Sequence, residues 1–174
     1  FTGTPLTENF DSLSSTGTAN PWTSNSTLTG WYAVQTIGTL STYRADPGTG
    51  TAGALYSYGT GGTVERALGS IASGTPGNFL YGARINNSAG NAVQAVTVSY
   101  DGEQWRNGGN ATPHKLVFEY SLNATSINDG AATWTAVNTL DFTGPVASAT
   151  AAAVDGNTTG SGAINNALLA TTLT

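Results

Sequence analysis

The sequence contains no cysteine and no methionine among its 174 residues. Without cysteine, disulfide bridges, thiolate catalysis and a cysteine-ligated zinc site are all excluded. Stability must therefore come from packing and hydrogen bonds. The chain starts at Phe1 rather than at an initiator methionine, which fits removal of a signal peptide. We accordingly expect a secreted protein, located in the extracellular space or at a cell surface.

Charge is scarce as well. Asp, Glu, Lys and Arg make up 9% of the residues, and the formal net charge is -5. Nucleic acids and anionic membranes attract proteins through basic patches, so both are excluded as main partners. The chain also lacks any run of about 18 apolar residues, so we expect no membrane span. The acidic, lysine-poor composition is typical of bacterial extracellular proteins.

Glycine is abundant, with 23 residues, and Thr, Ser and Asn are frequent, which favours short strands joined by tight turns. Apolar and polar residues alternate most clearly over residues 79–86, 96–101 and 115–122, which predicts three half-buried strands in sequential antiparallel order. Further strands are expected at residues 6–13, 28–35, 42–45, 53–58, 64–71, 132–142 and 163–173, with a weak strand or a helical turn at 146–154. The pair 53–58 and 64–71 should form a hairpin across residues 59–62.

About nine to eleven short strands with little or no helix predict an all-β fold, an antiparallel β-sandwich of the jelly-roll kind. The chain has the length of one domain, and no internal repeat or long linker divides it. We therefore predict a single domain over residues 1–174.

The segment from Tyr100 to Gly109 concentrates scarce charge, a tryptophan and loop glycines after an alternating strand. Its Glu103 and Arg106, together with Arg84 and Glu119 on flanking strands, can form cross-strand ion pairs. We favour this structural latch, because half-buried charges normally need partners. The alternative is that the same charges and Trp105 open toward a ligand such as a sugar.

Evidence for catalysis is weak. A glycosidase needs two carboxylates roughly 5 to 9 Å apart, and Glu65, Glu103 and Glu119 are not arranged as an obvious pair. The single histidine, His114, follows Pro113 at a strand start without a nucleophile motif, which favours a surface position. We predict that the protein is not an enzyme.

Aromatic residues are the candidates for ligand binding. Most of them must fill the core of a sandwich, and at most a few should be exposed. Trp31, Tyr32 and Trp105 are the residues that we expect at a binding surface, where an aromatic ring can stack on a sugar.

Calcium is a candidate cofactor, and no other cofactor is expected. Jelly rolls can hold Ca²⁺ between strand ends through carboxylate and carbonyl oxygens. Asp155, within Asp155-Gly156-Asn157, and Asp11 are the candidate ligands. The alternative is that residues 155–157 simply form a turn.

Several segments together resemble a β-sandwich module of secreted bacterial multidomain surface proteins. They are Glu8-Asn9-Phe10-Asp11-Ser12-Leu13, Gly30-Trp31-Tyr32, Glu65-Arg66-Ala67-Leu68-Gly69-Ser70, Phe79-Leu80-Tyr81-Gly82-Ala83-Arg84 and Gly102-Glu103-Gln104-Trp105-Arg106-Asn107-Gly108-Gly109. The last block is the most specific. The resemblance implies a noncatalytic accessory or surface role and carries over no catalytic residue. Such modules continue into two further strands, so a chain that stops at Thr174 would lack its closing strands.

These observations lead to two hypotheses. The first is an adhesion or binding module whose partner is a glycan or another cell-surface component. The second is a structural subunit of an extracellular assembly or filament, in which a strand of a neighbouring copy pairs with an open sheet edge. A glycoside hydrolase is a third and less favoured alternative.

Overall fold

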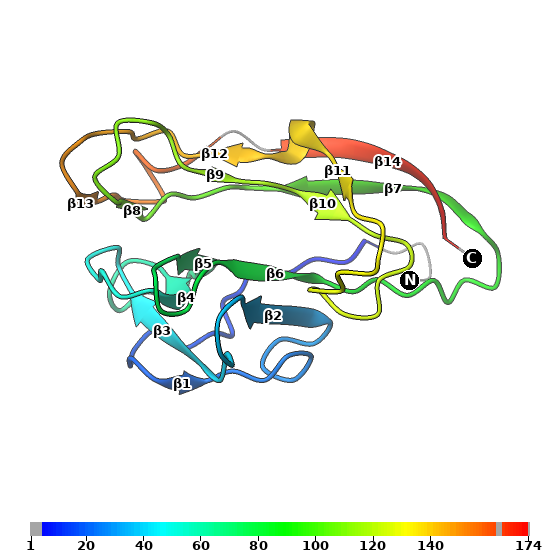
Figure 1. The fold of residues 1–174 in the computed structure, drawn as a ribbon, viewed down its shortest axis with the longest axis horizontal. Helices are drawn as coiled ribbons and strands as arrows, with labels where there is room; N and C mark the ends of the chain where they lie inside the picture. Colours follow the sequence, from blue (N-terminus) through cyan, green and yellow to red (C-terminus); the bar gives the residue numbers. More distant parts are fainter. Residues whose placement is uncertain (1–4, 163–164, 174) are drawn as a thin grey trace. The chain divides into compact units, whose positions relative to one another are not determined.

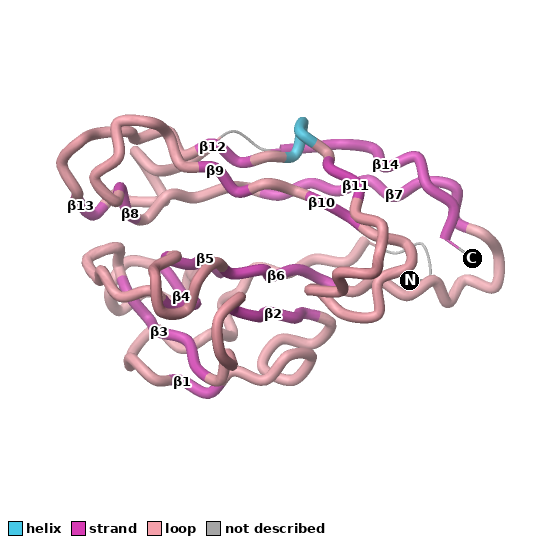
Figure 2. The backbone as a smooth tube through the Cα atoms, in the orientation of Figure 1, coloured by secondary structure: helices cyan, strands magenta, loops and turns pink. Residues whose placement is uncertain are grey.

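The computed structural model describes residues 5–162 and 165–173, and in these residues the protein is all-β with a single helical turn (Figures 1 and 2). This confirms the predicted all-β class with little helix. The chain folds into two compact units. The amino-terminal unit comprises residues 8–84 and 126–128, and the carboxy-terminal unit comprises 85–125 and the described part of 129–173, together with 5–7. A single jelly-roll sandwich over residues 1–174 stays a prediction.

The amino-terminal unit contains a sheet in the order β1-β3-β4-β5 and a separate antiparallel pair, β2 and β6. The strands are β1 (Asn20–Pro21), β2 (Trp31–Gln35), β3 (Thr42–Asp46), β4 (Ala54–Tyr58), β5 (Ala67–Ile71) and β6 (Phe79–Ala83). The β4–β5 pair is antiparallel and confirms the predicted hairpin. The β3–β4 pair is parallel, which the turn residues after β3 did not predict.

The core of this unit lies under β2, β3 and β4. Its buried members are Leu13, Trp22, Leu28, Ala33, Tyr43 and Leu55. Alternation along β2 places Trp31 and Ala33 on the core side, and the Trp31 ring meets Phe10 edge-on, with ring centroids 4.8 Å apart. Core packing therefore accounts for Phe10, Trp22, Trp31 and Tyr43.

A buried arginine crosses the same unit. Arg66 is 3% exposed, its Nε donates to Ser57 Oγ at 2.8 Å, and the guanidinium also donates to the Ser57 carbonyl. The Arg66 backbone N–H donates to Asp11 Oδ1 at 3.1 Å. Burial lowers the pKa of Arg66, because removal from water disfavours the charged form. Arg66 therefore ties β4 to the segment that precedes β5.

The carboxy-terminal unit is built from antiparallel pairs: β7 with β14, β8 with β13, β9 with β12, and β10 with β11. The elements are β7 (Val93–Tyr100), β8 (Arg106–Asn107), β9 (Lys115–Leu116), β10 (Glu119–Tyr120), β11 (Thr135–Ala136), the 3-10 helix η1 (Asn138–Leu140), β12 (Phe142–Thr143), β13 (Ala152–Ala153) and β14 (Asn165–Leu173). β14 confirms the last predicted strand, apart from residues 163 and 164, which lie outside the described residues.

The predicted sequential pairing of the three middle strands is wrong. β6 pairs with β2, β7 pairs with β14, and the expected strand at 115–122 is split into β9 and β10. Alternation reports which side of a strand is buried, but it does not report the neighbouring strand. The long-range partners β12 and β14 are selected by packing that the local pattern does not encode. Over the described residues, no helix is long and apolar enough to span a bilayer.

Candidate functional site

The candidate site lies in the carboxy-terminal unit, where β8 and β13 meet. Asn107 lies opposite Ala152 and Arg106 lies opposite Ala153 in this short antiparallel pair. The pairing continues for one more bond, because the Val154 N–H donates to the Trp105 carbonyl at 2.9 Å. The block around Trp105 therefore forms one strand of the site, and the alanine-rich segment forms the other.

Gln104 holds one side of the site. Its side-chain amide makes a two-way pair with the backbone of Val146, since Nε2 donates to the carbonyl at 2.9 Å and Oε1 accepts the N–H at 2.8 Å. Its backbone N–H donates to the Gly160 carbonyl at 2.8 Å. Gln104 is 7% exposed, so these bonds form away from bulk water. The side-chain amide thus bonds to both backbone groups of Val146, as a neighbouring strand would, and fixes the segment that follows Pro145.

Asn107 holds the next part of the same segment. Its Nδ2 donates to the carbonyls of Ser148 and Thr150 at 2.9 and 2.8 Å, and the residue is 1% exposed. A loop without regular structure needs partners for its backbone groups, and one buried amide supplies two of them here. The two amides, three residues apart, thus shape residues 146–150 into a defined wall.

Trp105 holds the opposite wall. The residue is 3% exposed, and its ring packs so closely on Gly156 that a Cβ there would lie 2.4 Å from ring atoms. Its Nε1 donates to Glu103 Oε2 at 2.7 Å. The backbone carbonyl of Asp155 then accepts the N–H groups of Thr158 and Gly160, which closes the turn over residues 155–160. Glycine at position 156 is required because any side chain would displace the ring.

Between these walls lies an open groove of about 440 Å³. Its lining residues are Asn107, Val146, Ser148, Thr150, Ala152, Ala153, Val154, Asp155 and Thr159. Four of these nine residues are small and apolar, three carry hydroxyl groups, and Asp155 is the one titratable side chain among them. The volume is in the range of small-ligand sites, and the mixture of methyl and hydroxyl groups suits a polyhydroxylated ligand.

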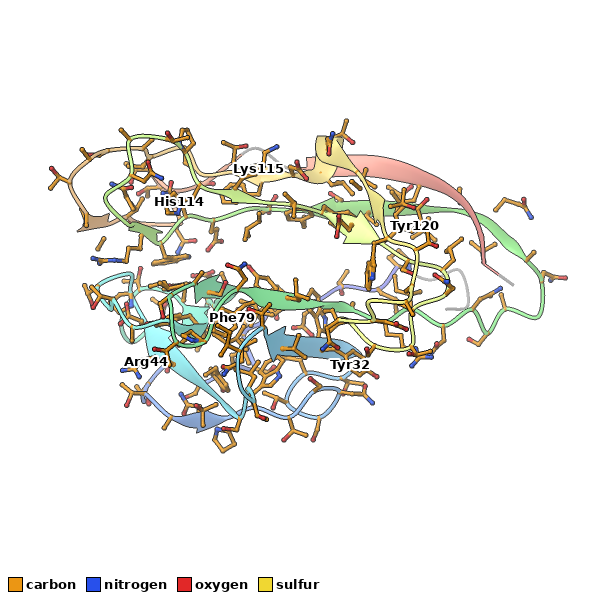
Figure 3. The ribbon with its side chains drawn as sticks, in the orientation of Figure 1. Tyr32, Arg44, Phe79, His114, Lys115 and Tyr120 are labelled. Carbon is orange, nitrogen blue, oxygen red and sulfur yellow. The ribbon has the colours of Figure 1, made fainter. Side chains whose placement is uncertain are left out.

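The structure corrects the predicted role of Trp105. A side chain that is 3% exposed and packed on Gly156 cannot stack on a ligand in this conformation. Trp31 and Tyr32 are half-buried on β2 of the amino-terminal unit, where Trp31 packs against the core and Tyr32 lies opposite Gly82 (Figure 3). These residues therefore do not line the groove.

The predicted latch involves residues with different surroundings. Arg84 is exposed at the end of β6, and its backbone N–H donates to Gly30 O at 2.8 Å. In the carboxy-terminal unit, Glu103 forms a bridge with Ser161, whereas Glu119 is exposed and lies opposite Ala136. Arg106 lies opposite Ala153, so the strand registers place none of these charges directly opposite another. The ion-paired latch of these four residues stays a prediction.

One ion pair that the structure describes lies at β9. Lys115 Nζ lies 2.7 Å from Asp141 Oδ2 (Lys115 is labelled in Figure 3). The hydrogen bond from Lys115, followed by the bond from the Phe118 N–H, lowers the pKa of Asp141. Burial raises the pKa of Tyr100, and the Asp141 carboxylate raises it further. The Tyr100 hydroxyl donates to the Leu140 carbonyl, so this cluster fastens η1 to β7.

The candidate calcium ligands serve as turn acceptors. Asp11 Oδ2 accepts Asn9 Nδ2 at 2.8 Å, in addition to the Arg66 bond at Oδ1, and Asp155 Oδ1 accepts the Asn157 N–H at 3.1 Å. The turn alternative at residues 155–157 is therefore present. Within residues 5–162 and 165–173, no three His, Asp or Glu residues gather in a way that could hold a metal ion.

Each of the predicted catalytic candidates has a different local environment. Glu103 is committed to the Trp105 indole, and Glu119 is exposed on β10. Glu65 belongs to the amino-terminal unit, and His114 is exposed just before β9, where its carbonyl accepts the Gly144 N–H (Figure 3). None of these residues lines the groove.

Sequence analysis missed Gln104, Asn107 and the wall that they hold. Both amides lie in the block singled out by its charge, but their partners are 41 to 43 residues further along the chain. The available signal was the presence of amide side chains on either side of a tryptophan, which suggests buried amides that need carbonyl partners.

Comparisons of this chain with family models, with curated proteins and with solved structures found no match. The resemblance to a module of secreted bacterial surface proteins therefore stays a prediction, and the case for function rests on the groove of the carboxy-terminal unit.

Proposed function

We propose that this protein is a noncatalytic carbohydrate-binding module of a secreted bacterial protein, and that the groove beside β8 and β13 holds the glycan. The observation that carries the proposal is the groove itself, an open site of about 440 Å³ whose walls are fixed by buried side chains. A groove with preformed walls loses little conformational entropy when a ligand binds.

The chemistry of the lining supports a sugar ligand. The side chains of Val146, Ala152 and Val154 offer methyl groups to the C–H surfaces of a sugar ring, and hydroxyl groups of Thr150 and Thr159 offer donors and acceptors to its hydroxyls. An open groove also admits an internal stretch of a long chain, which a closed pocket would not.

The lining also supports binding without catalysis. Glycoside hydrolysis requires two carboxyl groups on opposite sides of the scissile bond. Asp155 is the one carboxylate among the described lining residues, so a general acid and its partner are not brought together there. Secretion is supported by the acidic, cysteine-free composition.

The experiment measures glycan affinity by titration calorimetry across cationic, neutral and anionic tetrasaccharides. The test variant is Ala152→Leu, whose larger side chain would fill part of the groove, and the matched control is Ala136→Leu on β11, an exposed alanine in another two-residue strand. We expect the test variant to lose affinity by about tenfold, a change of roughly 1.4 kcal/mol, while the control retains it. Equal affinities of the two variants, or binding of no glycan by the parent protein, would contradict the proposal.

A further inference from the structure

Asp155 is the feature of the groove that its general shape does not explain. It stands at the start of the turn over residues 155–160 and lines the groove as an exposed residue. The backbone bonds of the turn and the bond from the Asn157 N–H to Oδ1 hold the side chain in place. Within the described residues, the second carboxylate oxygen of Asp155 accepts no hydrogen bond. One carboxylate oxygen of this lining residue is therefore left to accept a bond from a ligand.

Asp155 is the one charged residue among those that line the groove. The chain contains five basic residues, Arg44, Arg66, Arg84, Arg106 and Lys115, and none of them is among the residues that line the groove. The chain as a whole carries a net charge of -5. Among the lining residues, an anionic sugar would meet the Asp155 carboxylate and no basic side chain, whereas a cation would gain a charge-assisted hydrogen bond.

The rest of the lining limits the shape of that cation. The alanines of β13 and Val154 leave a methyl-lined floor beside Asp155, and Thr159 adds a hydroxyl on the same wall. A small amine would leave this floor uncovered. A cationic group on a sugar ring would reach the carboxylate while the ring covers the methyl groups.

We infer that the groove selects amino sugars with unacetylated amines, and that Asp155 is the specificity-determining residue that binds the ammonium group. This inference rests on the proposed function, since it names the class of glycan that the same groove takes. The ligand is an oligosaccharide of 2-amino-2-deoxy sugar units, held by one ion pair at Asp155 and by contacts of the neighbouring rings along the floor.

The experiment compares three tetrasaccharides at about pH 6, where a sugar amine is protonated: glucosamine, N-acetylglucosamine and galacturonic acid. The test variant is Asp155→Asn, which keeps an acceptor for the Asn157 N–H and removes the charge. The matched control is Asp101→Asn, an exposed aspartate of the same unit that is not among the residues lining the groove. Affinity is measured by calorimetry at low and high salt.

We expect the parent protein to bind the glucosamine tetramer most tightly and the galacturonic acid tetramer most weakly. Asp155→Asn should reduce affinity for the glucosamine tetramer roughly two- to fivefold, in the range of a partly exposed ion pair, and leave the acetylated tetramer unchanged. High salt should reduce the difference between the two tetramers, and Asp101→Asn should bind like the parent.

Two results would overturn the inference separately from the proposed function. One is equal binding of the glucosamine and acetylated tetramers, and the other is an Asp155→Asn variant that retains full preference for the amine. Either result leaves glycan binding by the groove intact. Binding of none of the tetramers would instead overturn both the inference and the proposed function.

Discussion

Replacement of Asn107 by alanine should loosen one wall of the groove. The side chain donates two hydrogen bonds, to the Ser148 and Thr150 carbonyls, at 2.9 and 2.8 Å from a position that is 1% exposed. Each such bond contributes a net 0.5–1.5 kcal/mol or so, and the freed carbonyls lie in exposed residues where water can partly replace the amide. The free energy of unfolding should therefore fall by roughly 1–3 kcal/mol.

The assay combines urea denaturation with amide hydrogen exchange. The local readout is the Ser148 N–H, which donates to Asn110 O at 3.1 Å and should lose protection when the wall is no longer held. The control is Asn138→Ala, since Asn138 is an exposed asparagine in η1. The reasoning would be refuted if Asn107→Ala matched this control in stability and left exchange of the Ser148 N–H unchanged.

Three further predictions concern the packing at Gly156, the buried Arg66 and the ion pair of Asp141. Gly156→Ala should destabilise the fold by roughly 1–3 kcal/mol, because the new Cβ would clash with the Trp105 ring. The control is Gly130→Ala, which should change thermal stability little because a Cβ there meets no atom within 4 Å. Equal effects of the two substitutions would argue against the close packing. Arg66→Leu should cost roughly 2–4 kcal/mol in urea denaturation, because it removes the donors to Ser57, and a change within 0.5 kcal/mol or so would contradict that role. The lowered pKa of Asp141 means that its ion pair contributes stability above the unfolded-state pKa of about 3.9. This contribution is lost as pH falls through the lower folded-state pKa. Asp141→Asn should therefore make the free energy of unfolding depend less on pH below about pH 4, and an unchanged pH dependence would be evidence against the pair.

Composition and alternation were sufficient to predict the fold class. The glycine, threonine, serine and asparagine content and the period-two pattern predicted an all-β chain, and the hairpin of β4 and β5 was found where glycines separate two apolar segments. These features are local, because a turn and its two strands lie within about 20 residues of sequence. They depend little on the rest of the molecule.

The strand partners and the groove could not be predicted in this way. The parallel contact of β3 with β4 and the pairing of β7 with β14 depend on which surfaces pack together after collapse. The groove walls depend on amides of Gln104 and Asn107 that bind carbonyls more than 40 residues away. A side chain that binds a backbone carbonyl leaves no mark on the sequence at the position of that carbonyl, because every residue has one.

Trp105 was predicted to bind a ligand because its surroundings also depend on residues that are distant in sequence. A tryptophan beside Glu and Arg in a charge-poor chain matches the pattern of a sugar platform as well as that of a packed strand. The distinction depends on Gly156, which admits the ring against the backbone, and on Glu103, which accepts the indole N–H. Both contacts give Trp105 a structural role beside the groove.

The most direct test of this account is an NMR titration of the isotopically labelled protein with the glucosamine tetramer. The account predicts that backbone amide shifts concentrate in residues 146–159, with the Asp155 and Thr159 amides among the most affected. It also predicts that the buried Trp105 indole N–H remains bonded to Glu103 and protected from exchange with solvent. Shifts that centre on Trp31 and Tyr32, or a Trp105 indole that is exposed and perturbed as strongly as the groove, would contradict the account.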